Sequence, residues 1–444
     1  MSTVKKDSDI VIISGGTATN SLVSMFQCVS SSLSFCMPIS DNGGSTSEIL
    51  RVLGGPAIGD IRSRITRLIP DEGFKRLLSH RLSEDPKEAK NEWTSIVEGD
   101  HQIWNGLDIQ CKEMIRSFLI HVHMELLKKS RNPNTNFRFE LASIGNLLLT
   151  GVRLFVGSLD SAIELLLRIT RIDPNIQILP CLNTNYTYHI SALLQNGDII
   201  TGQSQISHPS ESITEADIND STDYFQEADI SISENPTIFP HHYNQLYSTH
   251  EDIPYQHPDL LISQLRFSKD VNSPLQSPIN RIFYINQYGE EIHPRASSRT
   301  IKSLDNAEVI VYSIGSLMTS IIPILILKGM GYSIKNNSRA KKILLLNGNH
   351  DRETSGLTAY EFIQTIFNAA LYSYGENLIS TINYNDIITH LFYLETSEIK
   401  IDLEKIETLG IKCIKIPNDH NDAILDDIFL YDIIALQNNL QQII

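Results

Sequence analysis

The chain has 444 residues, of which 41% are apolar and 20% are charged, and its formal net charge at pH 7 is −16. This composition is typical of a globular protein with one large core or two modest ones. The negative charge disfavours long contact with a nucleic-acid polymer, which needs a positive stripe, and no apolar run approaches the roughly 20 residues of a membrane-spanning helix.

The N-terminal third begins with a predicted strand, helix and strand. Residues 1–9 are polar and show no secretory or transit segment, so a cytoplasmic protein is expected. The β-branched run Ile10–Ile13 ends in a Ser-Gly-Gly turn, as a strand buried on both faces does. A helix over Thr17–Val29 and a second strand over Ser34–Ile39 complete a unit that predicts two parallel strands with a right-handed crossover.

Helices dominate the next part of the chain. The second strand ends in the loop Ser40–Ser45, and a helix is expected near Glu48–Leu53. Residues 74–130 combine charge with apolar residues spaced three and four apart, which predicts a helical layer or cap. Further helices are expected over Leu147–Val156 and Ser161–Arg171.

The second half predicts a hairpin, a polar excursion and a return to the α/β pattern. The hairpin pairs Tyr188–Leu194 with Ile199–Gln205 around an Asn-Gly turn. Residues 207–278 are rich in Ser, Asp, Glu, Pro and His, which favours a partly ordered, loop-rich excursion. The pattern resumes with strands over Ala307–Tyr312 and Ile343–Leu346 and a helix over Leu357–Tyr372. We therefore expect an α/β fold with a mostly parallel sheet, as a single domain over residues 1–444.

The five cysteines exclude two kinds of stabilising site. Their number is odd and none is spaced as Cys-x-x-Cys, which argues against a disulfide framework and a structural zinc site. We expect them to be buried thiols.

Four predicted strands end in polar, glycine-containing loops. The loops are Gly15–Thr17, Asp41–Ser45, Gly315–Ser320 and Asn347–Asn349. Because the carboxyl ends of parallel strands open on one crevice, the four loops are expected to meet and to suit the diphosphate of a nucleotide. The first loop lacks the lysine of a P-loop and the pattern Gly-x-Gly-x-x-Gly, so Walker-type ATP hydrolysis and a standard dinucleotide fold are disfavoured.

Two aspartates are candidates for chemistry. Asp41 is the expected ligand of a magnesium ion, which proteins often hold with one or two carboxylates plus phosphate oxygens. The alternative is that Asp41 caps the helix that starts near Ser45. Asp60 either caps the helix that carries Arg62 and Arg64 or orients one of these arginines toward an anion.

Seven short motifs, in this order, resemble the CofD/YvcK family of 2-phospho-L-lactate transferases and UDP-sugar-binding regulators. They are Gly15-Gly16-Thr17, Ser40-Asp41-Asn42-Gly43-Gly44-Ser45, Gly59-Asp60-Ile61-Arg62, Gly145-Asn146, Gly202-Gln203-Ser204, Gly315-Ser316 with Thr319-Ser320, and Asn347 with Glu353-Thr354. The chain departs from the family pattern at Ala18, Ile58, Ser313, Ile314 and Arg352, so the resemblance leaves the identity of the substrate open.

The resemblance implies a three-layer Rossmann-like fold and a transferase that binds a GDP-type nucleotide diphosphate ester with Mg²⁺. A hydroxyl acceptor would attack the activated phosphorus and GMP would leave, with Asp41 and Asp60 as catalytic residues and Asp41 on the metal. The implied nucleotide- and phosphate-binding residues are Gly15, Gly16, Thr17, Asn42, Gly43, Gly44, Ser45, Arg62, Asn146, Gly315, Ser316, Thr319, Ser320 and Asn347. The alternative is a regulator that binds a nucleotide sugar without turnover, and a homo-oligomer is left open.

Overall fold

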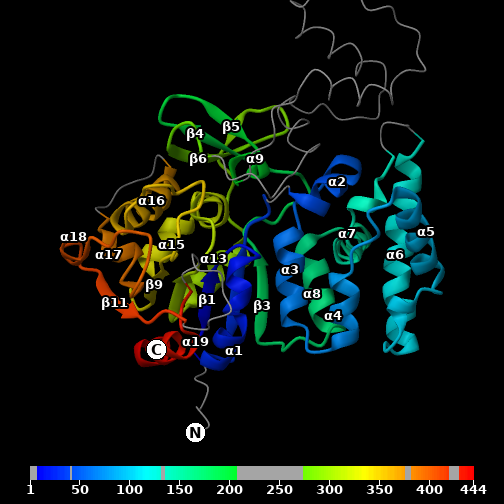
Figure 1. Cartoon of the computed structure of the whole chain (residues 1–444), viewed down its shortest axis with the longest axis horizontal. Helices are drawn as coiled ribbons and strands as arrows, with labels where there is room; N and C mark the ends of the chain where they lie inside the picture. Colours follow the sequence, from blue (N-terminus) through cyan, green and yellow to red (C-terminus); the bar gives the residue numbers. More distant parts are fainter. Residues whose placement is uncertain (1–7, 41–42, 132–135, 208–273, 376–381, 420–429) are drawn as a thin grey trace, which may run out of the picture.

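The computed structural model describes residues 8–40, 43–131, 136–207, 274–375, 382–419 and 430–444 (Figure 1). Asp41, Asn42 and most of the predicted excursion, residues 208–273, lie outside the described residues. Two sheets organise the rest, a large parallel one and a small antiparallel one.

The large sheet has seven strands, and every pairing in it is parallel. The strands are β1 (Ile10–Ile13), β2 (Leu33–Met37), β3 (Ile176–Pro180), β8 (Val309–Tyr312), β9 (Lys341–Leu345), β10 (His390–Leu394) and β11 (Lys412–Ile416). The strands β1, β2 and β8 are buried along their whole length, as their continuous apolar sequences predict. The α/β, Rossmann-like fold class is therefore confirmed.

The order of the strands places a switch point at β1. The sheet runs β11-β10-β9-β8-β1-β2-β3, so the chain builds outward from β1 to one side through β2 and β3 and later to the other through β8 to β11. In open α/β sheets, ligands bind beyond the carboxyl ends of the strands at such a point. The loops that follow β1, β2 and β8 are therefore the expected place for a site.

The chain between β2 and β3 is helical. Its elements are α2 (Gly44–Leu53), α3 (Gly59–Leu68), α4 (Glu72–Ser79), α5 (Pro86–Glu98), η2 (Gln102–Trp104), α6 (Ile109–Lys129), η4 (Phe139–Leu141), α7 (Ile144–Val156) and α8 (Leu159–Ile169). Asp71, Asp85 and Asp108 cap α4, α5 and α6 through their side chains. In Figure 1, α5 and α6 lie farthest from the sheet, and α6 packs on α7.

The other helices surround the remainder of the sheet. They are η1 (Ala18–Ser21), α1 (Val23–Val29), α9 (Gln203–Ser207), α13 (Ser298–Asn306), the π-helical turn η6 (Leu317–Ile321), α14 (Ile322–Leu325), α15 (Met330–Asn336), α16 (Ala359–Tyr372), α17 (Tyr384–Ile387), α18 (Leu403–Glu407) and α19 (Ile433–Ile443). The helix predicted over Thr17–Val29 begins as the 3₁₀ turn η1. The hydroxyl of Thr19 donates to the carbonyl of Ile314 at 2.9 Å, which ties this turn to the loop after β8.

The small sheet has the order β5-β4-β6-β7 and contains the predicted hairpin. Its strands are β4 (His189–Leu194), β5 (Ile199–Thr201), β6 (Ile279–Ile285) and β7 (Glu291–Ile292). Gly197 has φ +95° in the turn, which suits the Asn-Gly pair. The extension of the second strand to Gln205 is wrong, because Gly202 adopts φ +93° and the chain continues as α9.

The burial of the cysteines and the apolarity of the helices were also predicted from the sequence. Cys36 and Cys181 are buried, but Cys28 is exposed, so the expectation that all five thiols are buried is wrong. A search of the described residues finds no helix with the length and apolarity needed to cross a membrane.

Candidate functional site

Four neighbouring strands carry the four polar loops to one edge of the large sheet. The strands β9, β8, β1 and β2 lie side by side and run in parallel, so their carboxyl ends face the same way. The small sheet reaches this edge through α9, since Ser207 at the end of α9 hydrogen-bonds Thr319 of η6. The described parts of the four loops therefore follow strand ends at one edge of the sheet.

Both glycines of the first loop are in close contact with other parts of the protein. A Cβ on Gly15 would lie 2.5 Å from the Ser320 hydroxyl, and one on Gly16 would lie 2.6 Å from the Cα of Asp60. These glycines are needed first for the close approach of α3 and η6 to β1. Thr17 follows them with an exposed side chain.

A buried arginine on α3 hydrogen-bonds the backbone of the first loop. Arg64 is fully buried, its Nη2 donates to the carbonyl of Gly15 at 2.9 Å, and its guanidinium lies 4.7 Å from the centre of the Phe35 ring. Burial lowers the pKa of Arg64 to about 10, and the charge of Asp60 opposes that effect. The charge of Asp60 therefore acts on Arg64, and the role of Asp60 in orienting an arginine toward an anion stays a prediction. No side-chain cap forms at the start of α3, where Ile58 is the N-cap residue.

We call Ser45, Arg62 and Asn146 the α2 rim. The Asn146 Nδ2 donates to the Ser45 hydroxyl at 2.7 Å, and the Arg62 Nε donates to the Asn146 Oδ1 at 3.1 Å. Three segments predicted to bind phosphate, at the start of α2, in α3 and in α7, are therefore brought together. Gly44 opens α2 with φ +53°, a conformation that favours glycine, and the N-cap residue Gly43 has no side chain with which to cap the helix. The alternative role of Asp41 as a cap lies outside the described residues.

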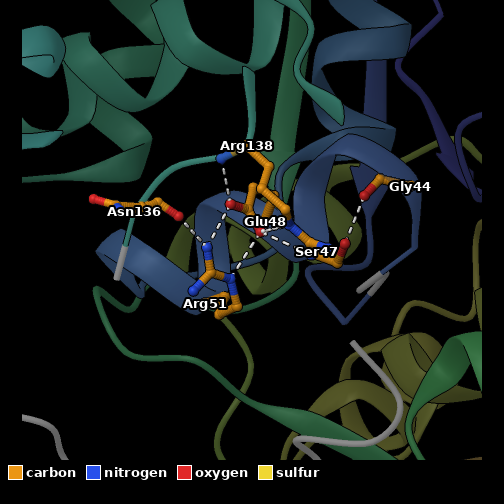
Figure 2. Close-up of polar contacts among 6 residues, drawn as sticks. All are labelled: Gly44, Ser47, Glu48, Arg51, Asn136 and Arg138. Atoms are coloured by element: carbon orange, nitrogen blue, oxygen red, sulfur yellow. Dashed lines mark hydrogen bonds and ion pairs between the residues drawn. The ribbon is translucent and has the colours of Figure 1, made fainter. Parts of the chain in front are cut away.

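Sequence reasoning missed Glu48, one turn into α2. Its carboxylate is buried and accepts hydrogen bonds from Arg51 and Arg138, which approach it from two sides (Figure 2). We call Glu48, Arg51 and Arg138 the Glu48 cluster. A glutamate next to an arginine in a helix usually indicates a solvent-facing pair, and Arg138 is too distant in sequence for any local spacing to reveal it.

The loops after β8 and β9 form a second group, which we call the β8–β9 rim: Ser207, Gly315, Thr319, Asn347 and Glu353. The N–H of Gly315 donates to the Asn347 Oδ1 at 3.1 Å, and the Asn347 Nδ2 donates to the Gly315 carbonyl at 2.8 Å. The Glu353 carboxylate accepts from the Thr319 N–H at 3.1 Å and from the hydroxyls of Thr319 and Ser207, each at 2.6 Å. Gly315, Thr319 and Asn347 thus lie together as predicted, although protein groups occupy their donors.

Glu353 was part of the recognised motif but was not predicted as a site residue. Only 5% of its surface is exposed, and burial raises its pKa to about 7, with a further contribution from the charge of Asp351. The side chain therefore changes charge near neutral pH while it holds η6 to α9.

The remaining predicted residues have mixed outcomes. Asp41 and Asn42 lie outside the described residues, so the expected metal ligand stays a prediction. Within the described ranges, no group of three or more His, Cys, Asp or Glu side chains is placed to hold a metal ion. Ser316 and Ser320 are half-buried at the two ends of the first turn of η6, and Ser320 lies beside Gly15.

Residues 10–417 match the family model described as 2-phospho-L-lactate transferase CofD. The chain belongs to the CofD family. It is also 46% identical over 419 residues to the uncharacterized protein YNL011C of Saccharomyces cerevisiae, a match that covers 91% of this chain and 94% of that one.

Solved structures support the same fold at lower sequence identity. Two crystal structures of protein BH3568 from Bacillus halodurans, one of them described as a member of the UPF0052 family, cover 98% of this chain and 99% of that protein. Their TM-scores are 0.60 and 0.61 at 17% and 16% identity. The CofD family fold therefore extends over both sheets and the helical segment between β2 and β3.

Proposed function

We propose that this protein binds a GDP-type nucleotide diphosphate ester with Mg²⁺ and transfers its phosphoryl-type group to a hydroxyl acceptor. The observation that carries the proposal is the meeting of the α2 rim, the first loop and the β8–β9 rim at the switch point of a parallel sheet. Membership of the CofD family, whose model is named for such a transferase, supports the reaction class.

The α2 rim has the chemistry that phosphate oxygens require. The N-terminus of α2 begins at Gly44, and a helix N-terminus attracts anions through its first N–H groups and the helix dipole. The guanidinium of Arg62 adds positive charge near Ser45, because Asn146 is hydrogen-bonded to both residues. This set can bind a diphosphate in a chain whose net charge is −16.

The reaction needs positioning and charge neutralisation more than a covalent protein intermediate. The acceptor oxygen forms a bond to the phosphorus that carries the ester, the bond from that phosphorus to GMP breaks, and the acceptor proton is released. The oxygen donors at this edge, the Asp60 carboxylate and the hydroxyls of Ser45 and Thr46, are of the kind that Mg²⁺ prefers, and Asp41 is the proposed direct ligand. Bound Mg²⁺ would supply charge neutralisation at the phosphates.

A second function is favoured by one sequence feature. The loop Asp41-Asn42-Gly43-Gly44-Ser45 is closer in form to the regulator branch of the resembled family than to the transferase branch. In that case the same crevice binds a nucleotide sugar without turnover, and the protein acts as a sensor.

Thermal-shift measurements distinguish the two functions. GDP, UDP, a GDP-lactate-type ester and UDP-sugars are each added with and without Mg²⁺ to the wild type, to Asp41→Ala and to the control Asp305→Ala on an exposed turn of α13. A ligand at 100 times its Kd adds about 2.7 kcal/mol of stability, a readily measured shift. Stabilisation by GDP compounds that requires Mg²⁺ and Asp41 supports the transferase. Metal-independent stabilisation by UDP-sugars supports the sensor, and no stabilisation by any compound contradicts both.

A further inference from the structure

The Glu48 cluster contains a buried carboxylate with five hydrogen bonds from two arginines (Figure 2). The side chain of Glu48 is 0% exposed. It accepts from the Nε and Nη2 of Arg51 at 2.8 and 2.6 Å. From Arg138 it accepts the backbone N–H at 2.7 Å, the Nη2 at 3.1 Å and the Nε at 3.3 Å.

The cluster joins two distant parts of the chain. Arg51 lies on the same helix as Glu48, whereas Arg138 belongs to the segment between α6 and α7. Arg51 also donates to the carbonyl of Asn136 at 2.6 Å, so both arginines tie α2 to residues 136–138. The part of α2 that carries Glu48 and Arg51 is therefore held to this segment by an ion pair and a hydrogen bond.

Stability alone does not account for these charges. Removing charged groups from water costs free energy, and an apolar trio of the same volume is often at least as stable. Buried ionic groups are better explained where they impose one geometry, because only one arrangement satisfies all their hydrogen bonds. Here the imposed geometry is the orientation of α2 just after its N-terminal turn.

We propose that Glu48 is a positioning residue for the first turn of α2 and sets how the N–H groups of Gly44 and Ser45 are presented to the phosphates of the ligand. This inference rests on the proposed function. Polar contacts fix the helix near its start, through the Ser45–Asn146 hydrogen bond, and one turn later, through the Glu48–Arg138 contacts. With both in place, the N–H groups of Gly44 and Ser45 keep one direction relative to Arg62.

Loss of the carboxylate should release the second anchor. Without Glu48, two guanidinium groups face each other with no anion between them, and the backbone N–H of Arg138 loses its acceptor. Arg138 is 37% exposed and can turn to water, whereas Arg51 is 19% exposed and keeps its bond to Asn136. The start of α2 would then keep its hydrogen bond to Asn146 but lose the Arg138 contacts one turn later, and its amides would open more often.

The test combines hydrogen exchange with ligand binding in Glu48→Gln. The matched control is Glu164→Gln, which alters an exposed glutamate that pairs with Arg168 at 2.8 Å on α8. We expect at least a tenfold rise in the exchange rates of the amides at the start of α2 and about a tenfold rise in the Kd for GDP with Mg²⁺. The control should change neither.

Arg138→Gln provides a second route to the same result, because this half-exposed side chain can be altered without leaving a space in the core. We expect it to reproduce both effects, and the double variant to be no worse than Glu48→Gln, as for two residues that act as a unit. Wild-type exchange and Kd in both single variants would overturn the proposal, as would faster exchange with an unchanged Kd. If the wild type binds no nucleotide, the proposed function fails, and exchange confined to α2 still decides whether Glu48 positions the first turn of α2.

Discussion

The two sides of the candidate site differ in charge. The α2 rim and the Glu48 cluster contain Arg62, Arg51 and Arg138 against one carboxylate. The β8–β9 rim is built from hydroxyl, amide and backbone groups around the single buried carboxylate of Glu353. The difference suggests a division of roles, in which the phosphates bind beside α2 and the β8–β9 rim fixes the shape of the crevice.

The largest effect is expected at Gly145, which precedes Asn146 in α7 and has no space around it for a side chain. In Gly145→Ala the new methyl group would clash with the carbonyl of Leu78 and lie 2.8 Å from the Cδ of Arg62. We expect a loss of about 3 kcal/mol in the free energy of unfolding, measured by urea denaturation. Gly157→Ala is the control, since its surroundings are open and only its φ of +76° opposes alanine, at a cost of about 1 kcal/mol. Equal losses would mean that α7 can move away from α4.

Two asparagines test the division of roles directly. Asn146→Ala removes a 1%-exposed side chain that bonds both Ser45 and Arg62, so it should cost about 1–3 kcal/mol of stability and weaken GDP binding about tenfold. Asn347→Ala breaks two bonds to the backbone of Gly315, and we expect a smaller loss of affinity. Calorimetric titration of both variants measures the difference. A greater loss of affinity in Asn347→Ala would place the phosphates on the β8–β9 side instead.

The smallest effect is a pH dependence specific to the β8–β9 rim. Burial raises the pKa of Glu353 to about 7, so the folded protein holds this proton more tightly than the unfolded chain does. The associated stability is fully present below the ordinary glutamate pKa of 4.5 and is lost as the pH rises from there to about 7, at up to about 1.4 kcal/mol per pH unit. In Glu353→Gln, thermal unfolding between pH 5 and 8 should lack this contribution, whereas the exposed Glu404→Gln on α18 should keep it. An unchanged pH profile in Glu353→Gln would assign the titration to another group.

Local sequence patterns were sufficient for β1, β2, β8 and β9, the strands behind the candidate site, but β3, β6, β7, β10 and β11 were not predicted. The run Ile10–Ile13 is β-branched and ends in glycines, and a parallel sheet then fixes where its loop lies. Local sequence patterns did not reveal the roles of Glu48 and Glu353, because the partners of these carboxylates are distant in sequence, as Arg138 is from Glu48. The glycines of the first loop were located correctly, but the interpretation that they make room for a ligand missed the packing of Gly16 against Asp60.

The pairing of β1 with β8 has a consequence for biosynthesis. The N-terminal strand leaves the ribosome early, but its neighbour on one side, Val309–Tyr312, is made almost 300 residues later. A nascent chain that stops before β8 has half of the crevice and exposes one edge of β1, and contacts of such long sequence separation form slowly. Under the proposed function, a nucleotide should therefore stabilise this protein only after β8 has been translated.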